Sequence, residues 1–258
     1  MEARKVETDN GWLWIKEGLV IYMKHPLLWT VLSTFTVFSL MSIASLPIIG
    51  DPLASLLMPV LLAGFMLGCD AVKQGKEFGL AHVFAGFKEH PHQLVTLGGI
   101  NFVALMLIMG AMKLTGGEKL VEMVMNGVQV DDPNIAAQVI ADAGISIVVG
   151  MSMYTVLVMA MQFAPALVLF NKAAPLAALK SSLQACLRNI MPLSVYGAIM
   201  MMFALVATLF TFMLGWLVLL PLMITSTYAA YRDLYPALEE SGNADEGKVL
   251  PRDDQEQF

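Results

Sequence analysis

The sequence predicts an all-α membrane protein with six transmembrane helices, built as three repeated units of an interfacial amphipathic helix plus a helical hairpin. Three observations predict it: apolar residues gather in long blocks, basic residues divide unevenly between successive loops, and proline recurs at matching places. Because the units repeat in the same orientation, their pseudo-threefold axis should run along the membrane normal. We expect residues 1–236 to form one six-span membrane domain, with units at approximately 10–72, 78–170 and 175–236.

The apolar blocks are the main evidence for membrane spans. Hydrophobic residues make up 57% of the chain and charged residues only 14%, whereas a soluble domain is about half apolar and a quarter charged. A span needs about 20 apolar residues, and its backbone must satisfy its own hydrogen bonds, so these blocks should be helices. Six blocks qualify, with no charged residue in the middle of any of them: Leu27–Ile49, Leu53–Val72, Leu94–Met112, Ile145–Leu169, Ile190–Met213 and Leu214–Tyr231.

The basic residues predict the orientation in the membrane, because short loops rich in lysine and arginine stay in the cytoplasm. With a cytoplasmic N-terminus, thirteen of the 15 Lys and Arg residues fall inside, and only Lys113 and Lys119 fall outside. Both termini are therefore predicted to be cytoplasmic. The polar, mixed-charge start MEARKVETDNGW also predicts that there is no cleaved signal peptide.

Two polar segments stand apart from the spans. Residues 113–144 form an outer-loop insertion in the second unit, where Asp132–Pro133 predicts a helix start. Residues 237–258 are mostly polar and acidic, which predicts a disordered acidic cytoplasmic tail. Much of the net charge of −6 lies in this tail, so the net charge says little about partners, and we expect no nucleic-acid partner.

An amphipathic helix is predicted before the first, third and fifth spans, because apolar residues recur there at helical spacing. Such helices can lie in the membrane interface with the apolar face towards the lipid. The three stripes are Trp12, Ile15, Leu19 and Tyr22; then Leu80, Val83, Phe84 and Phe87 in Gly79–Glu89; then Leu176, Leu179, Leu183 and Leu187 in Pro175–Arg188.

Prolines support the threefold repeat. A proline opens the first span of each unit, and another proline lies within the second span, where it predicts a kink that neighbouring helices compensate. Chance recurrence is the alternative, since apolar helices with prolines are common. Gly64 and Gly68 form a GxxxG pattern that predicts close helix packing. The opening prolines are Pro26, Pro91 and Pro192, and the predicted kinks lie at Pro59, Pro165 and Pro221.

Three stretches carry a family resemblance: GWLWIKEGLVIYMKHPLLW, LLMPVLLAGFMLGCDAVKQGKEF and HVFAGF. They resemble an uncharacterised proteobacterial family of six-span inner-membrane proteins. That family is distantly similar to YciC-like proteins and to the membrane domain of some glycerophosphodiester phosphodiesterases. The resemblance implies a bacterial inner-membrane location and a six-helix fold. It implies no activity, and no catalytic phosphodiesterase domain is attached.

The polar residues within the spans are the candidate functional residues. Asn101 and Gln162 are the polar side chains placed deepest, in the third and fourth spans. Polar groups inside a membrane often mark a pathway, but they also join helices by hydrogen bonds, and we favour the second role. Asp70 closes the second span at its cytoplasmic end, where a carboxylate can stay hydrated.

Metal and redox sites are weaker alternatives. The EHPH sequence brings His90 and His92 together, but a metal site needs further ligands, for which only Glu89 and Asp70 are close in sequence. The 20 methionines could bind Cu(I), although packing explains them better. Two cysteines without CxxC spacing indicate reduced structural thiols. We therefore predict no metal and no cofactor.

The functional prediction follows from the lack of recognised chemistry. No nucleotide-binding, zinc-protease or nucleophile-elbow motif is found, so an enzyme is the least favoured class. The sequence favours a non-catalytic scaffold or accessory factor that binds the phospholipid bilayer and a membrane protein partner, another lipid or a second copy of itself. The alternative is a transporter or channel for an uncharged solute or lipid, since the spans hold no deep charge for ion coupling.

Overall fold

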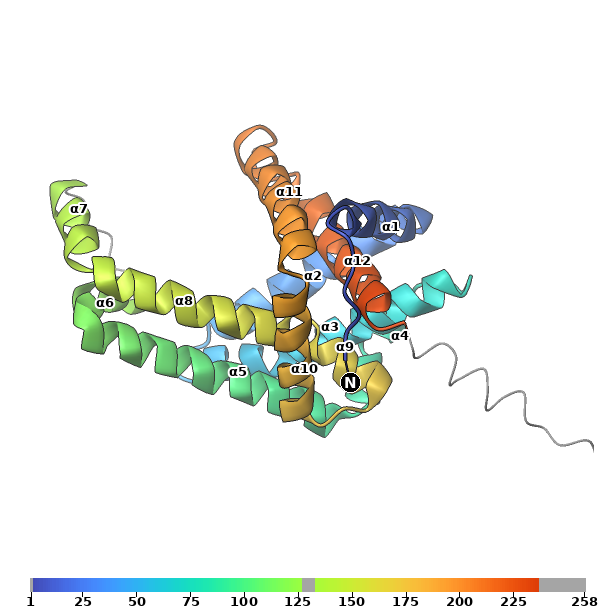
Figure 1. Cartoon of the computed structure of the whole chain (residues 1–258), viewed down its shortest axis with the longest axis horizontal. Coiled ribbons are helices and arrows are strands. Elements are labelled where there is room, and N and C mark those ends of the chain that lie inside the picture. Colours follow the sequence, from blue (N-terminus) through green and yellow to red (C-terminus); the bar gives the residue numbers. More distant parts are fainter. Residues whose placement is uncertain (1, 127–132, 237–258) are drawn as a thin grey trace, which may run out of the picture.

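The computed structural model describes residues 2–126 and 133–236, and all regular secondary structure in these ranges is helical (Figure 1). The predicted tail, residues 237–258, lies outside the described residues. Asp132 of the predicted helix start lies outside them too, and the helix begins at Pro133. The elements are α1 Asn10–Lys24, α2 Pro26–Ala44, α3 Gly50–Lys73, α4 Leu80–Val83, η1 Ala85–Phe87, α5 Pro91–Met112, η2 Lys113–Gly117, α6 Glu118–Asn126, α7 Pro133–Asp142, α8 Gly144–Met161, α9 Ala164–Asn171, α10 Pro175–Arg188, α11 Ile190–Leu209 and α12 Trp216–Leu234.

Five helical segments among the described residues are long and apolar enough to cross a membrane. The sixth predicted span, Leu214–Tyr231, corresponds in position to α12, which is not among the five. The second half of α12 contains Thr225 and Ser226, and its last turn contains Arg232 and Asp233, so its mean hydropathy is lower. The five segments are Pro26–Ala44, Gly50–Lys73, Pro91–Met123, Gly144–Asn171 and Ile190–Leu209.

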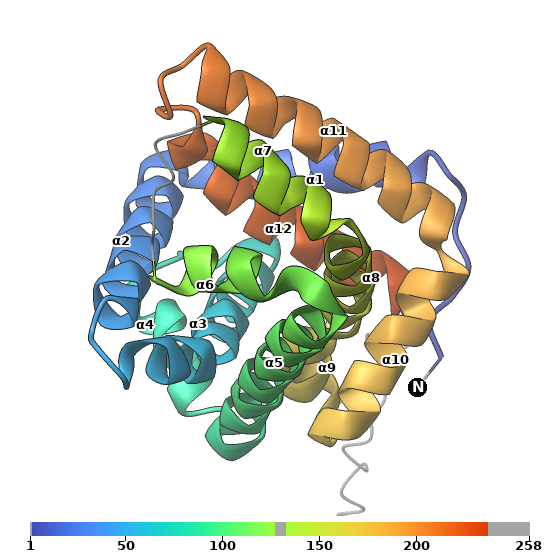
Figure 2. The same ribbon diagram turned by 90° about the vertical axis from the view of Figure 1, so that its left-hand side faces the viewer.

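The two longest of these apolar segments, Pro91–Met123 and Gly144–Asn171, contain α5 and α8. Figure 1 shows α5 and α8 side by side, with α6 and α7 at the end of the pair that lies farthest from α9. Figure 2 views the molecule from that end, and α6 and α7 lie in front of the other helices. The predicted insertion 113–144 therefore extends the α5–α8 pair by helices, apart from residues 127–132, which are not described.

Helix α1 packs along α12 and α11 through small residues. A β-carbon on Gly18 would lie 2.6 Å from the Ser226 Cα atom, so the two helices approach closely there. Of the predicted apolar stripe, Ile15 is buried, but Trp12 is 45% and Leu19 is 42% exposed. The predicted stripe is therefore divided between the packed face, which glycine forms, and the exposed surface. The position of α1 in the membrane interface stays a prediction.

The segment after α3 folds back across it. We predicted one amphipathic helix over Gly79–Glu89, but the structure has the short helix α4 followed by the 3-10 turn η1. Glycine explains the difference: a β-carbon on Gly86 would collide with the carbonyl oxygen of Val60 in α3. Next to this contact, the ring of Phe78 stacks on Trp29 of α2, with ring centroids 3.9 Å apart.

Helix α10 has the bounds that the sequence predicts, Pro175–Arg188, but it packs through its small residues. Ala178, Ser182 and Ala185 are buried against the neighbouring helices, while Leu176 is 72% exposed. Helix α9 lies in the centre of the molecule, where every residue from Ala164 to Leu169 is buried.

Candidate functional site

The span formed by α8 and α9 is broken in its middle. Helix α8 ends at Met161, and α9 begins at Ala164 with Pro165 in its first turn. Phe163 lies between them with φ −113° and ψ −4°. Proline has no N–H, and a broken helix leaves backbone groups that need other partners inside a membrane.

A serine from α10 supplies those partners. The Ser182 hydroxyl donates a hydrogen bond to the Met159 carbonyl at 2.8 Å and accepts one from the Phe163 N–H at 3.0 Å. These two groups would bond to each other in an unbroken helix. Ser182 is fully buried, so no water replaces it. The hydroxyl thus takes the place of the helical hydrogen bond between these two backbone groups and stabilises the break.

A cavity of about 410 Å³ lies beside this break, between α3, α5, α8 and α12. Asn101 and Gln162, the two deep polar residues singled out from the sequence, both line it. No charged residue is among the lining residues, and methionine and leucine dominate them. Such a lining suits an apolar or uncharged group with a few polar atoms.

Asn101 also joins two helices. Its Nδ2 atom donates to the Ser55 hydroxyl at 3.3 Å, and that hydroxyl donates to the Gly98 carbonyl at 3.1 Å. The helices α3 and α5 cross closely here, since a β-carbon on Gly98 would lie 2.5 Å from the Ser55 carbonyl oxygen. Asn101 therefore bonds across helices and also lines a cavity, whereas its role in a pathway stays a prediction.

Gln162 connects two cavities. Besides the first, it lines a second cavity of about 420 Å³ between α8, α10 and α11, which Ser194 and Gly197 also line. Within residues 2–126 and 133–236, the Gln162 side chain makes no hydrogen bond. Its amide is therefore available to a ligand.

Asp70 lies away from the cavities, at the end of α3. Its carboxylate accepts hydrogen bonds from the Tyr228 hydroxyl and from Gln74 Nε2, each at 2.7 Å. The Arg232 guanidinium lies 4.0 Å from the same carboxylate. Asp70 therefore links α3 to α12 through its hydrogen bond from Tyr228. The sequence analysis did not predict this contact.

The predicted kink prolines differ from one another. Pro165 is part of a true break, whereas Pro59 and Pro221 lie inside continuous helices, both of them buried. The GxxxG glycines face the folded-back segment: Gly64 meets the Val83 carbonyl, and Gly68 meets the Phe78 ring. These glycines do pack closely, but against a short segment and not against another span.

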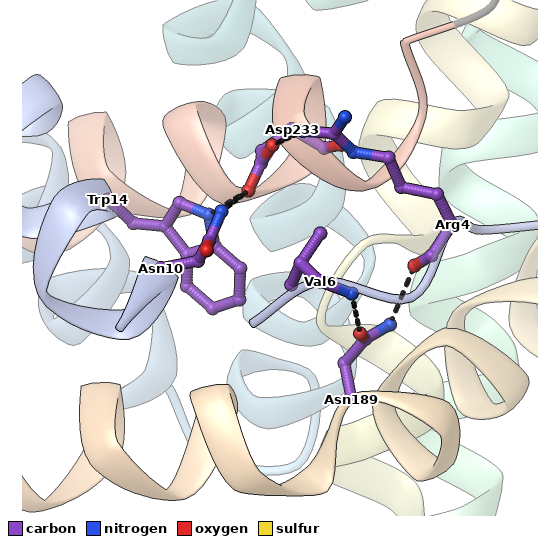
Figure 3. A network of polar contacts seen from close by, with 6 residues as sticks. All are labelled: Arg4, Val6, Asn10, Trp14, Asn189 and Asp233. Atoms are coloured by element: carbon purple, nitrogen blue, oxygen red, sulfur yellow. Dashed lines mark hydrogen bonds and ion pairs between the residues drawn. The ribbon is translucent and has the colours of Figure 1, made fainter. Parts of the chain in front are cut away.

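A second polar network ties the N-terminal segment to α12 and α11 (Figure 3). The Asp233 carboxylate accepts hydrogen bonds from Trp14 Nε1 at 2.7 Å and from Asn10 Nδ2 at 2.8 Å, and it pairs with Arg4. Asn189 donates to the Arg4 carbonyl at 3.0 Å and accepts from the Val6 N–H at 2.9 Å. This network also escaped the sequence analysis, because its members lie more than 180 residues apart.

The charge of Asp233 is stabilised by this network. Burial alone would raise the pKa of the carboxyl, but the hydrogen bonds from Trp14, Asn10 and Arg4, with the positive charge of Arg4, outweigh it. The pKa of Asp233 is therefore lowered from its ordinary value of 3.8.

His82, Cys69 and Cys186 occupy structural positions. In the described part of the chain, no three His, Cys, Asp or Glu side chains come together as a metal site would need. His82 accepts a hydrogen bond from the Gly79 N–H at 3.2 Å, close to the start of α4. Cys69 and Cys186 are free and buried, and burial raises the pKa of the Cys186 thiol to about 12. A thiol of this kind stays protonated and unreactive.

One known protein shares most of the chain's length. The chain is 26% identical over 211 residues to a protein of Burkholderia thailandensis named "Probable inner membrane protein". The match covers 80% of this chain and 77% of that protein. No family model and no solved structure matches the chain. The resemblance to YciC-like proteins and to the phosphodiesterase membrane domain therefore stays a prediction.

Proposed function

We propose that this chain is a non-catalytic protein of the bacterial inner membrane that binds a lipid through the cavity between α3, α5, α8 and α12. The observation that carries the proposal is that Asn101 and Gln162 line this one cavity without any charged neighbour. Its volume and its methionine- and leucine-rich lining fit an acyl chain with a polar ester or hydroxyl group. The similarity to an inner membrane protein supports the location.

The proposed membrane arrangement places this cavity at mid-depth. Asn101 lies ten residues into α5, and Gln162 lies nine residues before the end of α9. At about 1.5 Å per residue, both are roughly 15 Å from the same membrane face, in a hydrocarbon core about 30 Å thick. A polar group at that depth should have a partner, and a bound lipid would supply one to Gln162.

The finer architecture is also part of the proposal. We propose six spans with α12 as the sixth, arranged as three units related about the membrane normal, with both termini in the cytoplasm. The uneven distribution of lysine and arginine supports the orientation. Helices α1 and α10 would lie at the cytoplasmic interface, where Leu13 and Leu176, both exposed, would contact lipid. The same exposed faces are where a membrane protein partner or a second copy would dock.

A cavity-blocking variant tests the lipid proposal. Val158 lines the cavity, and Val156 lies on the same helix without lining it. In proteoliposomes, the probe is phosphatidylethanolamine with a photoreactive diazirine near the end of one acyl chain. Peptides containing Met161 and Met223, both cavity residues, should be labelled in the wild-type protein. Val158→Trp should strongly reduce that labelling relative to labelling of α11, and Val156→Trp should not. Equal labelling in the two variants would refute the proposal.

Transport of an uncharged solute is the second candidate, favoured because Gln162 lines both cavities. A path from one cavity to the other would pass this amide. The test is glycerol flux into proteoliposomes containing the wild-type protein or Asn101→Leu. Binding without transport predicts no flux above that of empty liposomes. A protein-dependent flux that Asn101→Leu abolishes would establish transport instead.

A further inference from the structure

A groove with several lysines shares no lining residue with the two cavities that Gln162 lines. It has a volume of about 470 Å³ and is formed by α1, the last turn of α3 and α12. Its charged members are Lys16, Glu17, Lys24 and Lys73, and its apolar members include Leu13 and Val20.

The groove carries an excess of positive charge. It has three lysines and one glutamate, which leaves two positive charges without a balancing carboxylate. In the described ranges, none of the three lysines forms an ion pair. Lys24 is held in place because its Nζ atom donates to the Val72 carbonyl at 3.0 Å, at the end of α3. The partial negative charge of that helix end also favours Lys73 in the last turn.

Asp70, an acidic residue near the groove, has other partners. Tyr228 lines the groove, and its hydroxyl donates to Asp70 at 2.7 Å. Asp70 also accepts from Gln74 and lies 4.0 Å from Arg232. Because these groups satisfy its carboxylate, Asp70 does not neutralise the lysines of the groove.

An exposed apolar wall lies beside the lysines. Leu13 is 42% and Val20 is 63% exposed, both on α1. Ile21 and Ala229 are buried below them and form the floor. The groove thus combines cations with an apolar surface. Both features match a phospholipid, because its anionic phosphate can pair with the lysines and its acyl chain can contact the apolar surface.

We propose that this groove binds one anionic phospholipid, with its phosphate between Lys16, Lys24 and Lys73 and an acyl chain along Leu13 and Val20. The inference rests on the proposed membrane embedding, with α1 at a membrane face, but not on a ligand in the Asn101–Gln162 cavity. Each lysine near an anionic headgroup contributes an attraction that corresponds to about a fivefold change in affinity. An anionic lipid should therefore bind better than a zwitterionic lipid by about tenfold or more.

Energy transfer from tryptophan measures this binding, since Trp12 lies beside Lys16, with the Nζ atom 6.0 Å from the ring centroid. The detergent-solubilised full chain is titrated with phosphatidylglycerol or phosphatidylethanolamine, each carrying a dansyl group on one acyl chain. We expect tighter binding of phosphatidylglycerol. Lys16→Gln and Lys73→Gln should each weaken it about fivefold. Both side chains are exposed, so these variants should fold. Lys180→Gln, an exposed lysine of α10 outside the groove, is the matched control and should bind like the wild type.

Two further outcomes decide between ligands. Inorganic phosphate or glycerol 3-phosphate, each in large excess over the dansyl lipid, should not displace that lipid. Displacement would show a soluble-phosphate site and overturn the lipid assignment. Equal affinity for the two lipids, or equal losses in Lys180→Gln and Lys16→Gln, would overturn the groove as a specific site. Labelling in the Val158 experiment would be unaffected by either failure, so the two proposals can fail separately.

Discussion

Replacing Ser182 by alanine should destabilise the junction of α8 and α9 by about 1–2 kcal/mol. The substitution removes one hydroxyl that has two partners, the Met159 carbonyl at 2.8 Å and the Phe163 N–H at 3.0 Å. Both partners are backbone groups, and Ser182 is fully buried, so water cannot replace the lost bonds without repacking.

The magnitude follows from counting these bonds. A hydrogen bond between membrane helices contributes about 0.6 kcal/mol on average and up to about 1.7. Two bonds give roughly 1–3 kcal/mol. The Met159 carbonyl keeps a weak bond from the Cys186 thiol at 3.4 Å, so its loss is partial. The Phe163 N–H loses its partner completely. Because only one of the two losses is complete, the total lies in the lower part of this range.

Two measurements check this prediction. Reversible unfolding in mixed detergent–SDS micelles gives the loss in free energy of unfolding, and hydrogen exchange reports the Phe163 amide. The control is Ser152→Ala, an exposed serine that bonds only to Val148 in its own helix, and it should change stability by less than about 0.5 kcal/mol. Equal stability losses in the two variants, with unchanged protection of the Phe163 amide, would refute the account of the break.

Three further predictions concern other parts of the chain. The pKa of Asp233 is lower in the folded than in the unfolded protein, so its contribution to stability is complete above the unfolded pKa, near 3.8. This contribution is lost as the pH falls through the folded pKa. Thermal unfolding of Asp233→Asn should therefore depend less on pH below about 4 than that of the wild type. Gly18→Ala should lower the free energy of unfolding by about 1–3 kcal/mol because α1 must move away from α12, whereas Gly110→Ala, with open space around it, should not lower it. Reporter fusions after Pro236 should read as cytoplasmic and fusions after Lys119 as periplasmic, and the reverse result would contradict the proposed topology.

The sequence predicted helices better than it predicted packing faces. The apolar runs and Pro175 located α10 with its correct bounds, because these signals are local. The packing faces were harder to predict. Leucine can face lipid as readily as it faces another helix, and small residues form the contacts between helices. In α1, for example, Gly11 and Gly18 form the close contacts with the neighbouring helices, whereas Trp12 and Leu19 are exposed.

The candidate site was also predicted in part. Asn101 and Gln162 stood out from the sequence because polar side chains are rare at membrane depth. Their common cavity depends on contacts between α3, α5, α8 and α12, which no local pattern encodes. Ser182 could not be recognised, since a serine on an amphipathic helix is ordinary until the backbone break that it satisfies is known.

The most direct test of lipid binding in the Asn101–Gln162 cavity is a high-resolution cryo-electron microscopy map of the protein in lipid nanodiscs, with an antibody fragment bound to allow alignment. We expect elongated density in the cavity between α3, α5, α8 and α12, with a polar atom within hydrogen-bonding distance of the Gln162 amide. A cavity closed by the side chains of Met58 and Met161, without any such density, would contradict it.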